Sequence, residues 1–387
     1  MLMRLSRLLP AAAIAGLAAA LVAVGSVWGG SAQAQTRLTV GGAGPLYYPT
    51  IIKQLPLGRF YFFGMDEASG PPLSVLEGYD LLNHMIGENW YPGSTAQVVE
   101  YPASMGLLSA SFTAPVVDAA VEMGRAALDT QIKGETADGE PAVVAALSEG
   151  TLVINRELAN LATDPKAPPA DKLSFAMFAN PETGLFNIYL PTGAHLPVVD
   201  YTSQDLPESQ YDLSVVFHQY DAWADPPDRP WNPAAVVNTL FGLAYFHDDT
   251  SVAAPSDVVE ISSVTSTLGG TTTTYMIPSP TLPMLIPLRQ IGVPTPIVDA
   301  LNSALKPVVD AGYSRLTPDA GPYFSHGMLV GSPALRSSAA VTARSPRPIA
   351  KSPAAKQTPG ARKASRPPNG TGRPAPATAR KGAHSAA

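Results

Sequence analysis

The feature that most restricts the fold is Ala142–Leu147, a run of six consecutive apolar residues. A strand without a polar face must be covered on both sides, as the central strands of a parallel sheet are. Residues 116–130 ahead of this run and 151–161 behind it show the helical spacing of apolar residues. A strand placed between two helices predicts an α/β domain with a mostly parallel central sheet.

The rest of the chain body continues this alternation. Strand-like segments lie at 37–40, 97–101, 172–178, 213–220 and 271–277. Residues 297–311 have a helical pattern that we expect Pro307 to break. Residues 181–212 are rich in proline, glycine and polar side chains, so we expect an insertion over the edge of the sheet. Residues 35–330 are long enough to form one large domain with its own core.

The N-terminal residues 1–34 have the pattern of an export segment. Arg4 and Arg7 precede an uncharged apolar run from Leu8 to Trp28, and residues 32–34 (Ala-Gln-Ala) offer a signal-peptidase site. The run is also long enough to remain as an uncleaved membrane anchor. In either case we expect the domain that follows to lie outside the cytoplasm, in the cell envelope.

The C-terminal residues 331–387 differ in composition from the body. They contain eleven lysines and arginines and no acidic residue, among many proline, alanine and serine residues. Such a composition predicts a disordered tail, which could bind anionic lipid or envelope polymers or simply be solvated. Without the tail's charge the net charge of −6 becomes −17 for residues 1–330, which argues against a nucleic-acid partner.

The chain has no cysteine, which excludes disulfides, thiol catalysis and cysteine-ligated metals. Its six histidines form no HExxH motif or other close pair of ligands. We therefore expect neither a metal ion nor a cofactor.

The main candidate for catalysis is Ser148, in the sequence Ala146-Leu-Ser-Glu-Gly150 between the buried strand and a helix. A nucleophile elbow needs this context, with small residues on both sides of the serine because strand and helix approach closely. The backbone N–H of Glu149 would then face a developing oxyanion. Alternatively, Ser148 is only the N-cap of the helix.

A second oxyanion donor is expected after an early strand, where residues 41–44 (Gly-Gly-Ala-Gly) allow close approach of the backbone, with Gly42 the candidate. Alternatively, these residues form an ordinary glycine-rich turn.

The acid and base of a serine hydrolase follow the nucleophile along the chain. Asp221 leaves the end of the 213–220 strand and is the first candidate acid, with Asp225 as the alternative; either could instead be an ordinary loop residue. His247 is the candidate base, and His326 is the second choice. The other histidines are poorly placed for this role: His84, His195, His218 and His384.

Residues 37–316 resemble the PE-PPE domain, a mycobacterial serine-hydrolase family related to cutinases. The resemblance lies in Gly41-Gly-Ala-Gly-Pro45, the Ser148 elbow, Tyr220-Asp-Ala-Trp-Ala-Asp-Pro-Pro227, residues 232–247, Tyr275-Met-Ile-Pro, residues 282–289 and residues 297–313. It implies a cutinase-like α/β-hydrolase fold and a Ser-His-Asp triad, and it favours His247 over His326. The elbow departs from the family's usual Gly-Tyr-Ser-Gln-Ser.

An export segment in place of a PE or PPE module is similar to the membrane-associated members, which move fatty acyl groups onto trehalose glycolipids. The resemblance thus implies acyl-ester or glycolipid substrates and a membrane surface as partner. A carboxylesterase or lipase, and a non-catalytic envelope-binding protein on a hydrolase scaffold, are the alternatives. Residues 278–296 could line an acyl groove or pack beneath the last helix.

Overall fold

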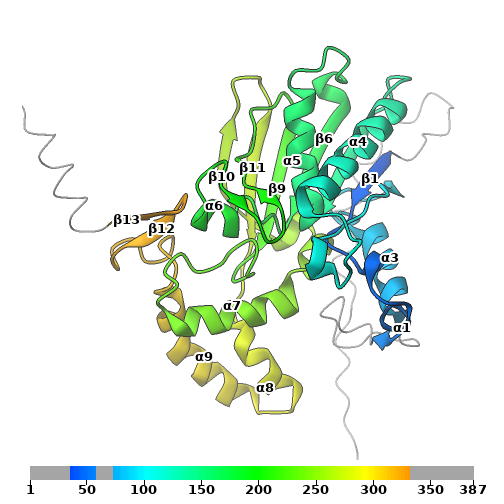
Figure 1. The fold of residues 1–387 in the computed structure, drawn as a ribbon. Coiled ribbons are helices and arrows are strands. Elements are labelled where there is room, and N and C mark those ends of the chain that lie inside the picture. Colours follow the sequence, from blue (N-terminus) through cyan, green and yellow to red (C-terminus); the bar gives the residue numbers. More distant parts are fainter. Residues whose placement is uncertain (1–34, 58–72, 332–387) are drawn as a thin grey trace, which may run out of the picture. The chain divides into compact units, whose positions relative to one another are not determined.

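The computed structural model describes residues 35–57 and 73–331, and they are built around a seven-stranded sheet (Figure 1). Across the sheet the strands are β10 (Val259–Thr265), β11 (Thr271–Ile277), β9 (Asp212–His218), β6 (Leu173–Phe178), β5 (Ala142–Leu147), β1 (Thr36–Val40) and β4 (Thr95–Val98). Every neighbouring pair is parallel except β10 with β11. The predicted α/β class with a mostly parallel sheet is confirmed.

The apolar run that defined the prediction is the central strand β5. It pairs with β1 on one side, where Val40 lies opposite Ala146, and with β6 on the other, where Leu147 lies opposite Phe178. All six of its residues are buried. The strand has no polar face because helices cover both of its sides.

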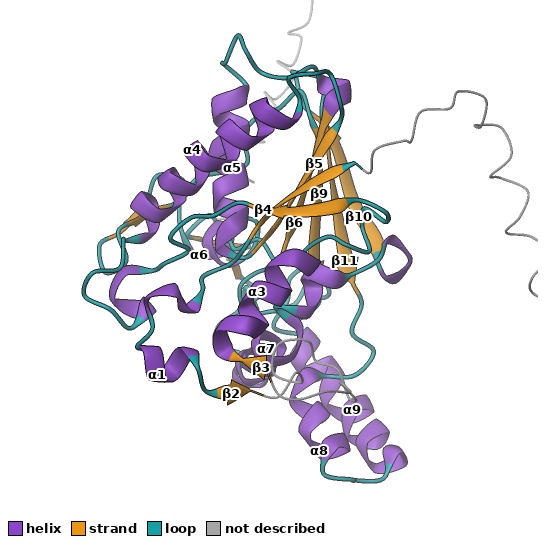
Figure 2. Cartoon of the chain, turned by 90° about the vertical axis from the view of Figure 1, so that its right-hand side faces the viewer, coloured by secondary structure: helices purple, strands orange, loops and turns teal. Residues whose placement is uncertain are grey.

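The longer helices are α3 (Val75–Met85), α4 (Val117–Glu135), α5 (Glu149–Leu161), α7 (Pro233–Phe246) and α9 (Thr295–Asp310), and the shorter ones are α1 (Thr50–Lys53), α6 (Leu185–Tyr189) and α8 (Ile286–Gln290). Helices α4 and α5 lie side by side along one face of the sheet (Figure 2). Val144 and Ala146 belong to the core with these two helices, whereas Ala145 and Leu147 belong to the core that includes α3 residues. Because successive side chains of β5 point to opposite faces of the sheet, this strand packs against the helix layers on both faces.

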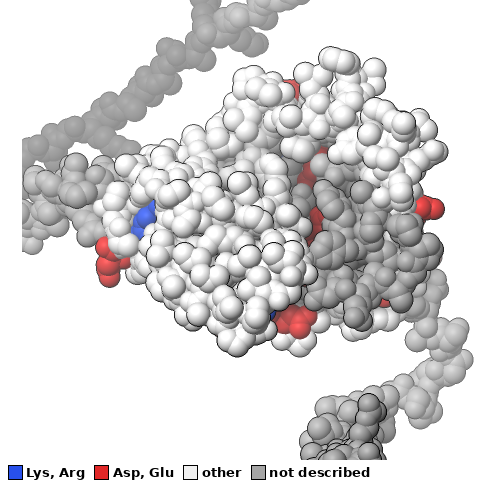
Figure 3. Space-filling model, turned by 90° about the horizontal axis from the view of Figure 1, so that it is seen from below, with Lys and Arg blue, Asp and Glu red and all other residues white. Residues whose placement is uncertain are grey.

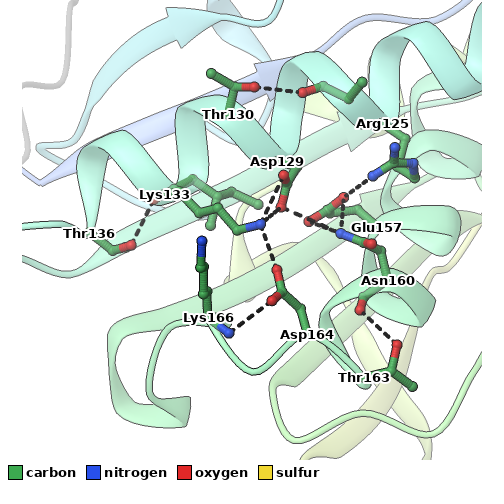
Figure 4. Close-up of polar contacts among 12 residues, drawn as sticks. Arg125, Asp129, Thr130, Lys133, Thr136, Glu157, Asn160, Thr163, Asp164 and Lys166 are labelled. Atoms are coloured by element: carbon green, nitrogen blue, oxygen red, sulfur yellow. Dashed lines mark hydrogen bonds and ion pairs between the residues drawn. The ribbon is translucent and has the colours of Figure 1, made fainter.

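Polar side chains tie α4 to α5 and to the loop after α5 (Figure 4). Lys133 Nζ lies 2.7 Å from a carboxylate oxygen of Asp129 and 2.6 Å from one of Asp164. Glu157 on α5 is fully buried, 3.5 Å from the Arg125 guanidinium. Burial raises the pKa of Glu157 to about 8, with the nearby Asp129 charge acting in the same direction. This network fixes the helix that begins at the predicted elbow.

Helices α7, α8 and α9 form a lobe at one end of the sheet (Figure 1). The lobe has a buried cluster of its own: Tyr220, Ala235, Leu282, Leu285, Val298, Val309 and Tyr313. The expected break at Pro307 is wrong, because α9 continues through it to Asp310. Pro307 stands in the last turn, where the missing N–H costs one hydrogen bond and little helix remains to be displaced.

The remaining segments are short. The 181–212 insertion contains α6 and a small hairpin of β7 (His195–Leu196) and β8 (Tyr201–Thr202); β2 (Pro56–Leu57) pairs with β3 (Leu73–Ser74), and β12 (Tyr323–Ser325) with β13 (Met328–Val330). The predicted export segment 1–34 and nearly all of the predicted tail 331–387 lie outside the described residues. No helix within residues 35–57 and 73–331 is long and apolar enough to cross a membrane.

Candidate active site

The strand order places a crevice between β1 and β5. Across the sheet the parallel strands lie in the order β4, β1, β5, β6, β9, β11, so the chain leaves β1 toward β4 on one side and leaves β5 toward β6 on the other. Ligands of such sheets bind beyond the carboxyl ends of the strands at this switch point. Gly42 follows β1 and Ser148 follows β5, so the predicted donor and nucleophile meet there.

Ser148 adopts a backbone conformation that side chains rarely take, with φ 53° and ψ −120°. Its N–H donates to the Phe178 carbonyl oxygen at 3.0 Å, which holds the turn between β5 and α5. The side chain makes no capping hydrogen bond to α5, although Ser148 occupies the N-cap position. A non-glycine residue at positive φ costs about 1–3 kcal/mol and clusters at functional sites. This backbone geometry is the one expected of a nucleophile elbow, and the capping hydrogen bond of the alternative interpretation is absent.

The glycines around the turn are required for steric reasons. A Cβ on Gly150 would collide with the backbone carbonyl oxygen of Val40, and a Cβ on Gly42 would lie 2.9 Å from Ser148 Cβ. Ala146 is completely buried. The small residues expected on both sides of the serine are therefore present because β1, β5 and α5 converge there.

Two backbone N–H groups beside the serine have no hydrogen-bond acceptor among the described residues, those of Gly42 and Glu149. Two tyrosine side chains hold the loop that carries Gly42 by hydrogen bonds to its carbonyl oxygens. Tyr79 donates to the Gly42 carbonyl oxygen at 3.0 Å, and Tyr101 donates to that of Gly41 at 2.6 Å. Both tyrosines were missed from the sequence, where nothing distinguishes them from core aromatics.

Asp221 and His247 are in direct contact. Oδ2 of Asp221 lies 2.8 Å from Nδ1 of His247, and both side chains are buried. Nε2 of His247 has no partner among the residues described. Burial alone would lower the pKa of His247, but the charge and hydrogen bond of Asp221 outweigh it and raise that pKa. The imidazole is therefore oriented through Nδ1, while its buried Nε2 is unbonded among the described residues, with no hydrogen bond to Ser148 Oγ.

The alternative acid, Asp225, is engaged elsewhere. Its carboxylate binds the Arg315 guanidinium at 2.5 and 3.1 Å and accepts a hydrogen bond from the Tyr220 N–H at 2.8 Å. The alternative base, His326, lies in the β12–β13 turn, where its ring contacts Ser325 and Asn187. Neither residue borders the pocket at Ser148.

The less suited histidines have other surroundings. His84 contacts Asp80, His195 contacts Thr202 and Asp200, and His218 stacks on Phe246. Burial lowers the pKa of His218 to about 4. His384 lies outside the described residues.

Ser148 and His247 border one pocket of about 520 Å³. Most of its lining is apolar and comes from several elements; among these residues are Ile52, Leu82, Met105, Leu152, Phe186 and Trp223. No residue of 278–296 lines the pocket; Leu282 and Leu285 pack in the α7–α9 lobe instead. The alternative reading of that segment, packing beneath the last helix, is the one observed.

Glu149 and Asp248 are the two carboxyl groups that line the pocket. Glu149 is 5% exposed, and neither of its carboxyl oxygens has a hydrogen-bond partner among the described residues. Burial raises its pKa to about 8, and burial also raises the pKa of Asp248. A neutral Glu149 at pH 7 would not oppose negative charge on a substrate oxygen bound at its own N–H. Within the described residues, no cluster of three or more histidine and acidic side chains could hold a metal ion.

Comparison with known proteins decides the family. Residues 92–314 match the PE-PPE domain. The chain belongs to the PE-PPE domain family. It is 53% identical over 295 residues to the PPE family protein PPE63 of Mycobacterium tuberculosis, and the match covers 76% of this chain and 58% of that protein.

Two further relatives from Mycobacterium tuberculosis are named as acyltransferases. SL1278 acyltransferase Chp1 is 36% identical, with 78% of this chain and 69% of the relative covered. Diacyltrehalose acyltransferase Chp2 is 37% identical, with 64% and 73% covered. The relatives support an acyl-ester hydrolase or acyltransferase.

Among solved structures, the catalytic core of acetyl xylan esterase from Trichoderma reesei matches with a TM-score of 0.29 and 11% identity, covering 56% of this chain and 98% of that one. A cutinase-like protein from Cryptococcus sp. matches with a TM-score of 0.27 and 14% identity, covering 49% and 79%. The α/β-hydrolase fold of the PE-PPE protein follows from its own strand order and elbow.

Proposed function

We propose that this PE-PPE protein is a serine acyltransferase that moves fatty acyl groups between trehalose-based glycolipids at the cell envelope. The observation that carries the proposal is His247, which lines the same pocket as Ser148, contacts Asp221 through Nδ1 and has no partner at Nε2 among the described residues. The names of the two acyltransferase relatives support this choice of substrate class. Because the chain spans 58% of PPE63, no activity of that whole protein is carried over.

In the proposed first half-reaction, Nε2 of His247 accepts the Ser148 proton as Oγ attacks the ester carbonyl carbon. The backbone N–H groups of Gly42 and Glu149 bind the resulting oxyanion. As the C–O bond to the leaving sugar breaks, His247 returns the proton to that oxygen, and the acyl group remains on Ser148 as an ester. Asp221 keeps Nδ1 protonated and stabilises the imidazolium throughout.

In the second half-reaction, a hydroxyl of the acceptor loses its proton to His247 and attacks the acyl carbonyl carbon; as the ester bond to Ser148 breaks, His247 returns the proton to Oγ. If water takes the place of the acceptor, the same site is an esterase or lipase, which is the second candidate function. The largely apolar lining favours a long acyl chain as the bound group, because burying each methylene contributes about 0.8 kcal/mol.

One polar residue of the pocket lining favours an acceptor. Asp248 follows the proposed base in sequence and lines the pocket, and no described residue donates a hydrogen bond to its carboxylate. A carboxyl group in that position could bind a sugar hydroxyl beside the base. The export pattern of residues 1–34 supports a location of this chemistry outside the cytoplasm, in the envelope.

The test is to incubate the purified full chain with an acylated trehalose donor and a trehalose-lipid acceptor and to identify the products by mass spectrometry. We expect acylated acceptor, and Ser148→Ala should lower its formation by on the order of 10⁴-fold. Ser303→Ala is the matched control, because Ser303 bonds only the Asp299 carbonyl on α9. Free fatty acid as the only product would establish the esterase. Failure of the wild type to react with a fluorophosphonate would leave a non-catalytic binding protein.

A further inference from the structure

Large apolar side chains are exposed on three segments that surround the pocket. Phe112 is 96% exposed, Val198 81% and Ile51 74%. Leu107 and Leu108 are exposed as well. Single exposed apolar residues are common, but a contiguous group usually marks an interaction surface. We call segments 45–57, 103–116 and 190–199 the rim.

Each rim segment also reaches into the pocket. Ile52 and Leu55 line it from the first segment, Met105 from the second and Val199 from the third. Ile51 and Val198 adjoin lining residues in the chain, Leu107 and Leu108 follow Met105 within three residues, and Phe112 lies further along the same segment. The apolar surface therefore continues from the outside of the molecule into the pocket that holds Ser148. The rim belongs to the entrance of the pocket and is not an isolated patch.

The rim is also free of acidic residues. Its three segments contain one lysine, Lys53, one histidine, His195, and no aspartate or glutamate. The chain to residue 330, by contrast, has a net charge of −17. Figure 3 shows a largely uncharged surface, with a hollow in which acidic side chains lie. An anionic membrane would repel the acidic body, but it would not repel this edge.

Together, these features identify the partner by its chemistry. A protein partner would leave no reason for the apolar surface to run into the catalytic pocket, whereas an acyl chain leaving a bilayer must cross apolar surface to reach Ser148. We propose that the rim docks on a lipid surface, with Phe112, Leu108 and Ile51 inserted among the lipids and the pocket open toward them. Apolar side chains dock in this way at the boundary between headgroups and acyl chains. The inference rests on the proposed function only for the identity of the substrate.

The absence of cysteine makes a direct test possible, since any introduced cysteine can be labelled alone. Ile51→Cys and Phe112→Cys in the full chain are labelled with a polarity-sensitive fluorophore and titrated with phosphatidylcholine vesicles at 0.15 M salt. These vesicles carry no net charge, so the basic C-terminal residues are not drawn to them. Val264→Cys is the matched control. It is 64% exposed and lies opposite Thr272 at the amino end of β11, away from the carboxyl ends where the pocket opens.

We expect a blue shift on vesicle addition at positions 51 and 112 and none at 264. Replacing both Leu108 and Phe112 by serine in the Ile51→Cys protein should weaken the response at least about tenfold, since burying one such side chain contributes about 1.5–3 kcal/mol. Equal shifts at all three positions, or none at 51 and 112, would overturn the proposal. A shift at 112 that grows with protein concentration without lipid would identify a second copy of the chain as the partner. The probe reports contact and not turnover, so the result is independent of whether Ser148 is the nucleophile.

Discussion

Asp221 and His247 are 26 residues apart in the chain, yet their side chains meet at 2.8 Å. Asp221 follows β9, and His247 directly follows the last residue of α7. The two ends are brought together because α7 packs closely on the turn after β9. Gly242 of α7 lies directly against the Tyr220 carbonyl, and Thr239 donates a hydrogen bond to the same oxygen at 2.9 Å.

The first prediction separates the two aspartates. Asp221→Asn should lower kcat by about 10³- to 10⁴-fold with little change in melting temperature, because the imidazole loses its orientation and its counter-charge. Asp225→Asn should have the opposite effects. Turnover per folded molecule should stay within a few-fold of the wild-type value, while the free energy of unfolding should fall by about 1–3 kcal/mol because the bonds to Arg315 and Tyr220 weaken. Steady-state kinetics and thermal melts of both variants test this prediction. Equal losses of kcat in the two variants would contradict the assignment of Asp221 as the triad acid.

The second prediction concerns the protonation of Glu149. With its pKa raised to about 8 by burial, the side chain ionises above that pH, beside the proposed oxyanion. Tyr79 and Tyr101, whose charged forms would add to the negative potential there, stay neutral because burial raises both pKa values. At pH 9 we expect kcat/KM about tenfold below its value at pH 7. Glu149→Gln, which cannot ionise, should retain its activity at pH 9.

The same residue links stability to pH. Its folded-state pKa lies above its ordinary value of 4.5, so the folded chain holds a proton that the unfolded chain releases. Its contribution to stability is therefore complete below about pH 4.5 and is lost as pH rises through about 8. Thermal melts should show Glu149→Gln gaining stability relative to wild type as pH rises from 5 to 9. A constant difference would show that Glu149 is charged throughout.

The third prediction uses three glycines that differ in their surroundings. Gly42→Ala places a methyl group 2.9 Å from Ser148 Cβ, so the loop must shift and carry the Gly42 N–H away from the proposed oxyanion. We expect kcat to fall by about 10²- to 10³-fold, as it does when an oxyanion donor is lost. Gly150→Ala presses on rigid backbone and should cost about 1–3 kcal/mol of stability. Gly134→Ala in α4 meets no atom within 4 Å and should be neutral or stabilise by about 0.5–1 kcal/mol. Loss of activity in Gly134→Ala would refute this steric explanation.

The fourth prediction concerns the basic C-terminal residues. Deleting residues 332–387 removes eleven positive charges and should weaken binding to anionic vesicles without changing turnover of a short soluble ester. The loss should shrink as salt rises, because exposed charges are screened. Replacing all eleven lysines and arginines by glutamine is the control for length. Undiminished binding of the truncated chain at low salt would exclude a membrane role for the tail.

The sequence predicted the central strand and the turn at Ser148, because short stretches of residues determine both. Six apolar residues predicted the central strand, because helices cover both of its faces. Small residues around Ser148 predicted the sharp turn from strand to helix, because β1, β5 and α5 converge there. The positions of Asp221 and His247 followed from chain order relative to the strands. Their catalytic roles stay predictions until the variants are measured.

Other features depend on contacts that the sequence does not display. Strand β10 was missed because it is the antiparallel edge strand and is exposed along its whole length, so no buried run of apolar residues marks it. The choice between Asp221 and Asp225 required Arg315, which contacts Asp225 but lies 90 residues further along the chain. The raised pKa of Glu149 likewise arises from burial by separate segments and not from its neighbours in sequence.

The lobe of α7, α8 and α9 has the smallest of the three buried clusters within the described residues, and His247 stands where α7 leaves it. Small clusters are the first to open in partial unfolding. On heating, the proposed proton acceptor should therefore leave Ser148 while the sheet and elbow remain intact. Heat inactivation would then precede the loss of secondary structure, and brief cooling would restore activity by re-docking one lobe, without refolding the chain.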